Sequence, residues 1–193
     1  MIIDFARVRS ALPGLLFSTL EAVPLPLFLL CVSWLRPVAS IEWRTPYYVS
    51  TVAALLTTSI IWARRHTLNR ICLGLNLYFM SGSIGLAAGW QWLNDFYGAV
   101  EATGMLIWIV AVGIAATFGS KSGFVGNVVD DERVVKRLSL YLLATALAVT
   151  IFSWCFQGNP ALSAYLPFIV LFTAHAVLRS KARAKVPTQA KIF

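Results

Sequence analysis

Long apolar segments alternate with short polar segments along the whole 193-residue chain. Roughly 20 apolar residues in a helix are needed to cross about 30 Å of hydrocarbon. The pattern therefore predicts an all-α fold, a polytopic transmembrane helical bundle with six spans. The predicted spans are residues 12–35, 47–63, 71–92, 97–119, 138–156 and 161–178. Together they form a single transmembrane domain over residues 1–193.

The composition supports a membrane protein. Only 12% of the residues are charged, 59% are hydrophobic, and the mean hydropathy is +0.75. A typical soluble domain has about a quarter of its residues charged. The formal net charge of +8 does not indicate nucleic-acid binding, because the basic residues lie in short segments between apolar runs.

The basic residues divide unequally between the two sides of the predicted membrane. Of the 16 Lys and Arg residues, all except Arg36 and Arg44 fall on the side that holds both chain ends. Positive charge stays on the cytoplasmic side during insertion. We therefore predict a multi-pass protein of a bacterial-type cell inner membrane, with cytoplasmic N- and C-termini. Most tryptophans agree, because they fall near the outer ends of the spans: Trp34, Trp43, Trp90, Trp92 and Trp154.

Two basic segments are predicted to lie in the cytoplasm. Residues 120–137 are expected to include a short amphipathic helix on the membrane surface, with Asp130 near its N-terminus and Lys136 and Arg137 near its C-terminus. Residues 179–193 are expected to form a disordered basic tail. Both segments would be attracted to anionic lipid headgroups.

Two carboxylates, Glu21 and Glu101, lie within predicted spans. A carboxylate in hydrocarbon costs about 2.5–3.5 kcal/mol and usually faces the interior of the bundle. Glu21 is expected near the middle of the first span, and Glu101 closer to the outer headgroups.

Prolines follow Glu21 closely. Because proline lacks a backbone N–H, Pro24 and Pro26 are expected to free the carbonyls of Leu20 and Ala22 from the helix. A carboxylate beside freed carbonyls is a candidate proton or cation site, as at the broken helices of transporters. Alternatively, the helix is only kinked, and Glu21 is protonated or paired with a polar neighbour such as Asn76.

His175 lies near the inner end of the last span. It is either a proton relay for Glu21 or an interfacial residue. The candidate intramembrane polar site therefore consists of Glu21, Asn76, Glu101 and His175. The arrangement that favours transport is one in which Glu21, Asn76 and His175 meet in a single cavity.

Small residues recur at four-residue spacing in the third span, at Ser81, Gly85 and Gly89. Such a ridge allows close helix packing, either within the chain or between two copies. In addition, residues 17–22 resemble residues 97–102, with an aromatic four positions before Glu and Ala directly after it. Three spans separate the two segments, which suggests a 3+3 inverted repeat.

No motif of a serine hydrolase, zinc protease, phosphate loop or dinucleotide site is present in the sequence. Cys31, Cys72 and Cys155 lie within or at the ends of apolar runs and are interpreted as small hydrophobic residues. We therefore expect no enzymatic activity, no metal site and no cofactor.

Three stretches resemble the small polytopic membrane family around intracellular septation protein A. Residues 11–17 (ALPGLLF) open the first span, and residues 118–126 (FGSKSGFVG) are similar to a phenylalanine–glycine–lysine run of that family. Residues 154–159 resemble its last hairpin. The resemblance implies a cell-envelope role, in which the protein supports wall or division machinery through membrane partners.

Three functions are compatible with the sequence. The first is a non-enzymatic inner-membrane protein that acts through membrane partners or a homo-oligomer. The second is a small proton- or cation-coupled transporter that uses an intramembrane Glu. The third is an immunity protein against a membrane-active toxin, since such proteins are also small, basic and polytopic.

Overall fold

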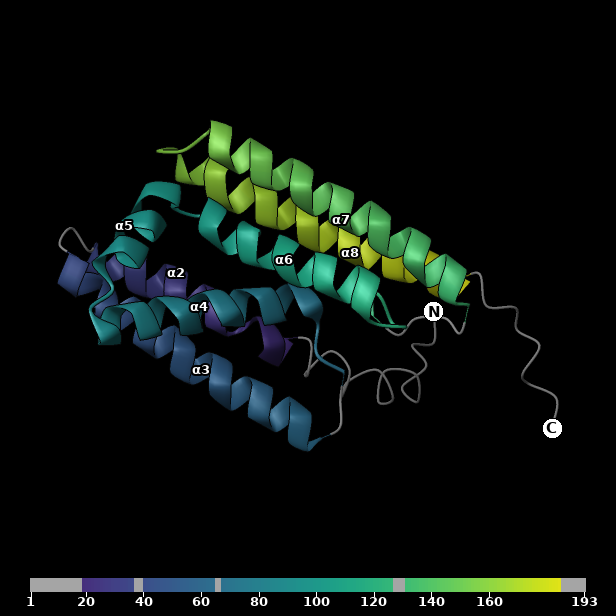
Figure 1. Ribbon diagram of the computed structural model, residues 1–193, viewed down its shortest axis with the longest axis horizontal. Helices are drawn as coiled ribbons and strands as arrows, with labels where there is room; N and C mark the ends of the chain where they lie inside the picture. The colour runs from purple at the N-terminus through teal and green to yellow at the C-terminus, as the bar shows by residue number, and fades with distance from the viewer. Residues whose placement is uncertain (1–18, 37–39, 65–66, 127–130, 185–193) are drawn as a thin grey trace, which may run out of the picture.

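The computed structural model describes residues 19–36, 40–64, 67–126 and 131–184. Within these ranges the regular elements are all helical (Figure 1). The longer ones are α2 (Pro24–Leu35), α3 (Arg44–Ala63), α4 (Arg70–Ala88), α5 (Gln91–Val100), α6 (Thr103–Gly119), α7 (Glu132–Cys155) and α8 (Leu166–Ala184). A 3₁₀ turn (Ser40–Trp43) precedes α3, and a π-helical turn (Ala161–Tyr165) precedes α8.

Four helices are long and apolar enough to cross a membrane: α3, α4, α7 and the helix Ala161–Ala182 that contains most of α8. The bent pair of α5 and α6 adds a fifth if it counts as one span. The first predicted span corresponds to the shorter apolar helix Thr19–Leu35, which includes α2 and is about 25 Å long at 1.5 Å per residue. Its predicted residues 12–18 lie outside the described ranges. The all-α prediction is thus confirmed, with four to five candidate spans in the described chain.

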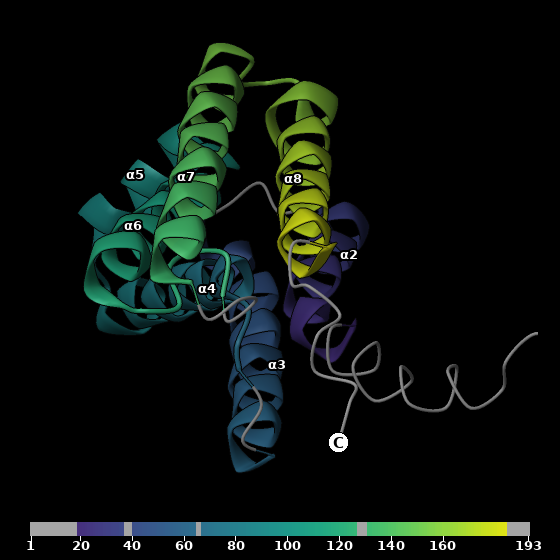
Figure 2. The same ribbon diagram turned by 90° about the vertical axis from the view of Figure 1, so that its right-hand side faces the viewer.

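Helices that follow one another in the sequence pack side by side. Figures 1 and 2 show α2, α3 and α4 in one group and α6, α7 and α8 in another, with α4 and α6 at the centre. The α4–α6 interface is the most extensive, because the two backbones approach closely at Gly74. A Cβ atom on Gly74 would lie 2.7 Å from the Cα of Ile109.

α2 packs along α3 and contacts α4 through the side chain of Phe28. Its buried residues are Glu21, in the turn before α2, together with Pro24 and Phe28, and the spacing of three and four places them on one helix face. The Phe28 ring lies 5.3 Å from that of Tyr47 on α3 and 5.1 Å from that of Phe79 on α4.

The third and fourth predicted spans have the wrong boundaries. α4 ends at Ala88 rather than at Trp92, because Gly89 adopts a left-handed φ of 68° and its N–H caps the carbonyl of Gly85. α5 then crosses the end of the bundle, and α6 begins only at Thr103 after a 99° bend. The residues predicted to start the fourth span, 97–100, therefore belong to α5.

The predicted surface helix within residues 120–137 is wrong. Phe124 and Val125 are buried, and Phe124 packs against Gly113 of α6. α7 starts at Glu132 because the Asp131 carboxylate accepts hydrogen bonds from the N–H groups of residues 133 and 134. Lys136 and Arg137 consequently lie in the second turn of the long α7, not at the end of a separate helix, while Asp130 lies outside the described ranges.

The tail prediction is wrong in part. α8 continues through Ala184, so residues 179–184 are helical, whereas residues 185–193 lie outside the described ranges. The sequence of this extension is rich in Ala, Arg and Lys, which favour helix, and the next proline is Pro187.

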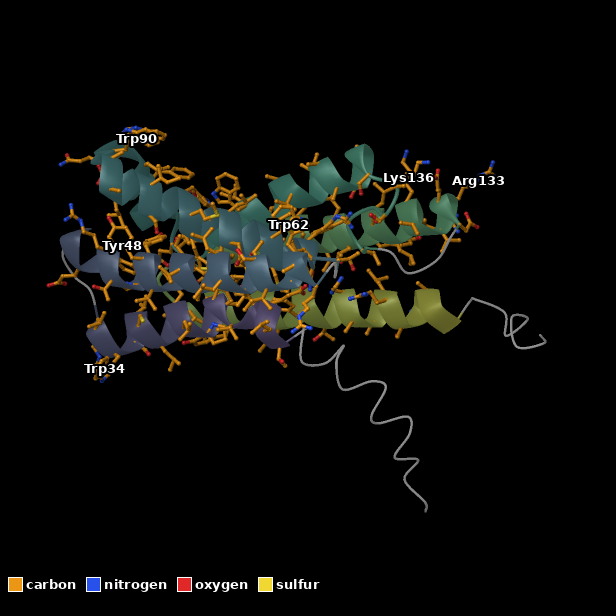
Figure 3. All side chains as sticks on the ribbon, turned by 90° about the horizontal axis from the view of Figure 1, so that it is seen from below. Trp34, Tyr48, Trp62, Trp90, Arg133 and Lys136 are labelled. Carbon is orange, nitrogen blue, oxygen red and sulfur yellow. The ribbon has the colours of Figure 1, made fainter. Side chains whose placement is uncertain are left out.

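The two ends of the bundle differ in chemistry. Figure 3 shows Trp34, Tyr48 and Trp90 at one end, here called the aromatic end, and Arg133 and Lys136 at the opposite, basic end. Apart from α5, the helices α2 to α8 alternate in direction between these ends (Figure 1).

Candidate functional site

Glu21 is 8% exposed and lies at the start of the helix Thr19–Leu35. Its Oε1 accepts a hydrogen bond of 3.3 Å from the backbone N–H of Asn69, the N-cap residue of α4. The carbonyl of Leu20, which the prolines were expected to free, accepts the N–H of Val23 at 3.3 Å instead. Glu21 therefore joins the beginning of α2 to the beginning of α4.

Asn76 lies two helical turns further along the same face of α4 as Asn69 and Cys72. It is 4% exposed, and its Nδ2 donates a hydrogen bond of 3.0 Å to Thr58 Oγ1 on α3. Within the described chain its Oδ1 is buried without a hydrogen-bond partner. Such an amide oxygen costs about 1–3 kcal/mol. The predicted pairing of Asn76 with Glu21 is thus replaced by a contact with α3.

His175 is buried on α8, close to the backbone of Val125. Arg179 follows one turn later on the same helix. His175 therefore lies between α8 and the segment after α6, while Glu21 lies just before α2 and Asn76 lies on α4. The structure joins each of the three residues to a different partner.

Glu101 lies in the bend between α5 and α6, near the aromatic end, and is exposed. Its φ of 48° is unusual for a residue other than glycine, and such backbone strain costs about 1–3 kcal/mol. Two hydrogen bonds of 3.1 Å hold the bend against the α7–α8 connection. Glu101 Oε2 accepts the N–H of Gly158, and Gln157 Nε2 donates to the carbonyl of Ala99.

Two buried hydroxyls, those of Thr103 and Ser153, are hydrogen-bonded next to this bend, and the sequence analysis did not predict this pair. Thr103 Oγ1 and Ser153 Oγ are 2.8 Å apart, and Ser153 donates to the carbonyl of Ser163 in the π-helical turn at 2.6 Å. These contacts join α6, α7 and the start of α8. Single Ser and Thr residues in apolar runs carry no spacing signal, so their pairing could be found only from the fold.

Three buried aromatic residues form a second group that the prediction missed. The hydroxyls of Tyr47 and Tyr78 are hydrogen-bonded to each other, and the hydroxyl of Tyr97 contacts Ser81 Oγ at 2.6 Å and Trp108 Nε1 at 2.9 Å. The group links α3, α4, α5 and α6 near the aromatic end. A tyrosine within an apolar run is a usable signal, because its hydroxyl requires a partner when buried.

The predicted ridge of small residues serves packing inside the chain. Ser81 bonds Tyr97, and a Cβ atom on Gly85 would lie 2.8 Å from a methyl group of Leu93 on α5. Gly89 forms the cap at the end of α4. The ridge thus brings α5 close to α4.

In the described ranges, no group of three or more His, Cys, Asp and Glu residues is placed to hold a metal ion. No protein-family model, curated protein or solved structure matches the chain.

Proposed function

We propose that the chain is a non-enzymatic, multi-pass inner-membrane protein that supports cell-envelope or division machinery through membrane partners. The observation that carries this proposal is that buried polar side chains form hydrogen bonds between neighbouring helices. Examples are Asn76 with Thr58, Thr51 with Ser83 at 2.7 Å, and Thr103 with Ser153. Each pair stabilises a helix contact, which makes the bundle a rigid scaffold.

In this proposal the chain crosses the membrane six times, with both ends in the cytoplasm and the basic end facing inward. The helix Thr19–Leu35 makes the first crossing, and residues 12–18, just before it in the sequence, are also mostly apolar. The bent pair of α5 and α6 counts as one crossing. This arrangement keeps nearly all Lys and Arg residues on the cytoplasmic side. It also keeps α2–α4 and α6–α8 as two groups of three, as an inverted repeat would require.

A surface for a partner helix is offered by the outward face of α7. Ala144 and Ala148 are exposed there at four-residue spacing, and the larger Leu147 and Ile151 stand beside them. In lipid, small residues allow two helices to approach closely, and packing then drives their association. The resemblance to the septation protein A family supports a partner in the cell envelope.

A photo-crosslinking amino acid at position 148 tests this function in living cells. We expect covalent adducts to a specific membrane protein of the envelope, because residue 148 faces outward from α7. Position 146 is the matched control, since Ala146 lies on the same helix but is only 1% exposed. Adducts confined to lipid from position 148 and from the other exposed faces would contradict a role through protein partners.

A second candidate function is proton- or cation-coupled transport. It is favoured by the burial of the Glu21 carboxylate beside Pro24. A carboxylate supplies oxygen atoms that bind protons or hard cations. In this hypothesis the site uses Glu21 without Asn76, which is bonded to Thr58 on α3, and it would be reached from the beginning of α4.

For transport, Glu21→Gln should abolish pH-dependent flux in proteoliposomes while leaving the amount of inserted protein unchanged. The Gln side chain keeps the oxygen that accepts the N–H of Asn69 but loses the titratable carboxyl. Glu132→Gln is the matched control, because Glu132 is an exposed acid at the start of α7. Full flux in the Glu21→Gln protein would rule this function out.

A further inference from the structure

Arg70, the first residue of α4, points its guanidinium at the segment that follows α6. Its Nη2 donates to Ser122 Oγ at 2.7 Å and to Ser120 Oγ at 3.0 Å. Its Nη1 donates to the carbonyl of Ser122 at 3.4 Å. Arg70 is partly buried by these contacts. A cation at the basic end of the bundle is therefore held by two hydroxyls and one carbonyl.

None of these partners of Arg70 carries a negative charge. The ion pair found in the described chain joins Lys121 of this segment to Glu132 at 3.9 Å, does not include Arg70, and has two largely exposed side chains. Partial burial of a guanidinium is costly unless a counter-charge compensates for the lost water. A bound anion would supply that charge.

The two serine hydroxyls can also donate hydrogen bonds to an anion. Each hydroxyl oxygen accepts a hydrogen bond from Arg70 and so keeps its own proton to donate. The two oxygens are 3.4 Å apart, so one hydroxyl can donate to the other while the second faces a ligand. Lys121 stands between the serines in the sequence, and its side chain is 92% exposed.

The segment that carries these serines is fixed in place before any ligand binds. The N–H of Gly123 bonds the carbonyl of Ser120, and the N–H of Gly126 bonds the carbonyl of Ser122, both at 3.0 Å. Deeper in the bundle, the N–H of Val125 donates to Ser139 Oγ at 3.3 Å. A preformed arrangement of donors loses little entropy on binding.

We propose that Arg70, Ser120, Lys121 and Ser122 bind the phosphate group of an anionic phospholipid from the cytoplasmic leaflet. Three of the five guanidinium N–H groups of Arg70 donate to the two serines, and the remaining two can donate to phosphate oxygens, while a lysine adds charge without fixed geometry. Arg70 opens α4 and Ser120 directly follows α6, so the site lies at the level where two membrane helices end. The choice of the cytoplasmic leaflet depends on the membrane orientation given in the proposed function. The assignment of the four binding residues does not depend on that orientation. The pair between Lys121 and Glu132 is too exposed to prevent binding.

The test measures the melting temperature of the purified full-length protein in a neutral detergent, with added phosphatidylglycerol or phosphatidylcholine. We expect phosphatidylglycerol to raise the melting temperature of the wild type by several degrees and phosphatidylcholine to have no such effect. Arg70→Gln should lose most of this shift. The double variant Ser120→Ala/Ser122→Ala should lose part of this shift. Because the double variant keeps the charge of Arg70, it tests the site even where Arg70→Gln does not fold. Arg133→Gln, which removes an exposed charge from the same end, should retain the full shift.

Native mass spectrometry supplies a second readout, with fewer phosphatidylglycerol molecules expected on the Arg70 and double-serine variants than on Arg133→Gln. Equal losses in all variants would mean diffuse attraction to the basic end and would overturn the proposed site. A stabilisation by inorganic phosphate that depends on Arg70, without one by phosphatidylglycerol, would assign the site to a soluble phosphate and overturn the lipid. Loss of the lipid site would leave the crosslinks from position 148 unaffected, so the two proposals can fail separately.

Discussion

Replacing Gly74 by valine will separate α4 from α6 and leave the purified protein unfolded at temperatures at which the wild type is stable. A Cβ atom at this position would lie 2.7 Å from Ile109 Cα and 3.0 Å from Ile109 N. Both are backbone atoms, so the overlap can be relieved only by moving a whole helix. Because α4 and α6 form the central interface between the two groups of helices, we expect a loss of at least about 3 kcal/mol in the free energy of unfolding.

The measurement is the melting curve in detergent, together with the yield of monodisperse protein after purification. Gly98→Val is the matched control, because Gly98 is exposed on α5 and a Cβ atom there would meet nothing within 4 Å. The control should change stability by no more than about 0.5 kcal/mol, the usual size of a surface substitution. If the Gly74 and Gly98 variants melt alike, the close approach of α4 and α6 is not part of the native fold.

The second prediction concerns which end of the bundle faces the cytoplasm. Alkaline phosphatase fused after the connections at the aromatic end should be active, and green fluorescent protein fused after those at the basic end should fluoresce. The informative fusion positions are Arg36, Trp90 and Gly158 for the outside and Arg64, Gly126 and Ser180 for the inside. The expectation follows from the retention of Lys and Arg in the cytoplasm, which assigns the basic end to that side.

The first crossing is the part of this topology that most needs a test. In the full-length protein, an N-terminal tag should be protected from protease added outside intact spheroplasts. A tag at Gly158 in the same cells is the positive control, because the α7–α8 connection lies at the aromatic end. An N-terminal tag that is cleaved from outside would show that Thr19–Leu35 does not cross, leaving five crossings at most.

The sequence predicted the all-helical character of the chain better than the ends of its helices. Gly89 was interpreted as part of a packing ridge, because a glycine in an apolar run looks the same whether it packs a helix or caps one. The bend at Glu101 carries no proline or glycine at the break itself. It is imposed by contacts with distant segments, chiefly those of Tyr97 with Ser81 and of Glu101 with Gly158, which no local pattern encodes.

The polar residues show the same limit. The sequence placed Glu21 within a span, and the structure buries it as a costly carboxylate should be. The partners were not predictable, because Asn76 meets Thr58 of α3, and His175 meets the segment at Val125, only once the helices that carry them have packed. Arg70 was counted only as a topology determinant, although its contacts with Ser120 and Ser122 bring together residues that lie 50 and 52 positions apart.

The bend between α5 and α6 also sets how the protein fits bilayers of different thickness. A straight helix over residues 91–119 would be about 43 Å long at 1.5 Å per residue, well beyond a typical hydrocarbon core of about 30 Å. With the bend, α6 alone is about 25 Å long, and in the proposed topology the ten residues of α5 lie near the headgroups. The remaining difference of about 5 Å from the hydrocarbon core would then be matched at a cost of only fractions of a kcal/mol per Å.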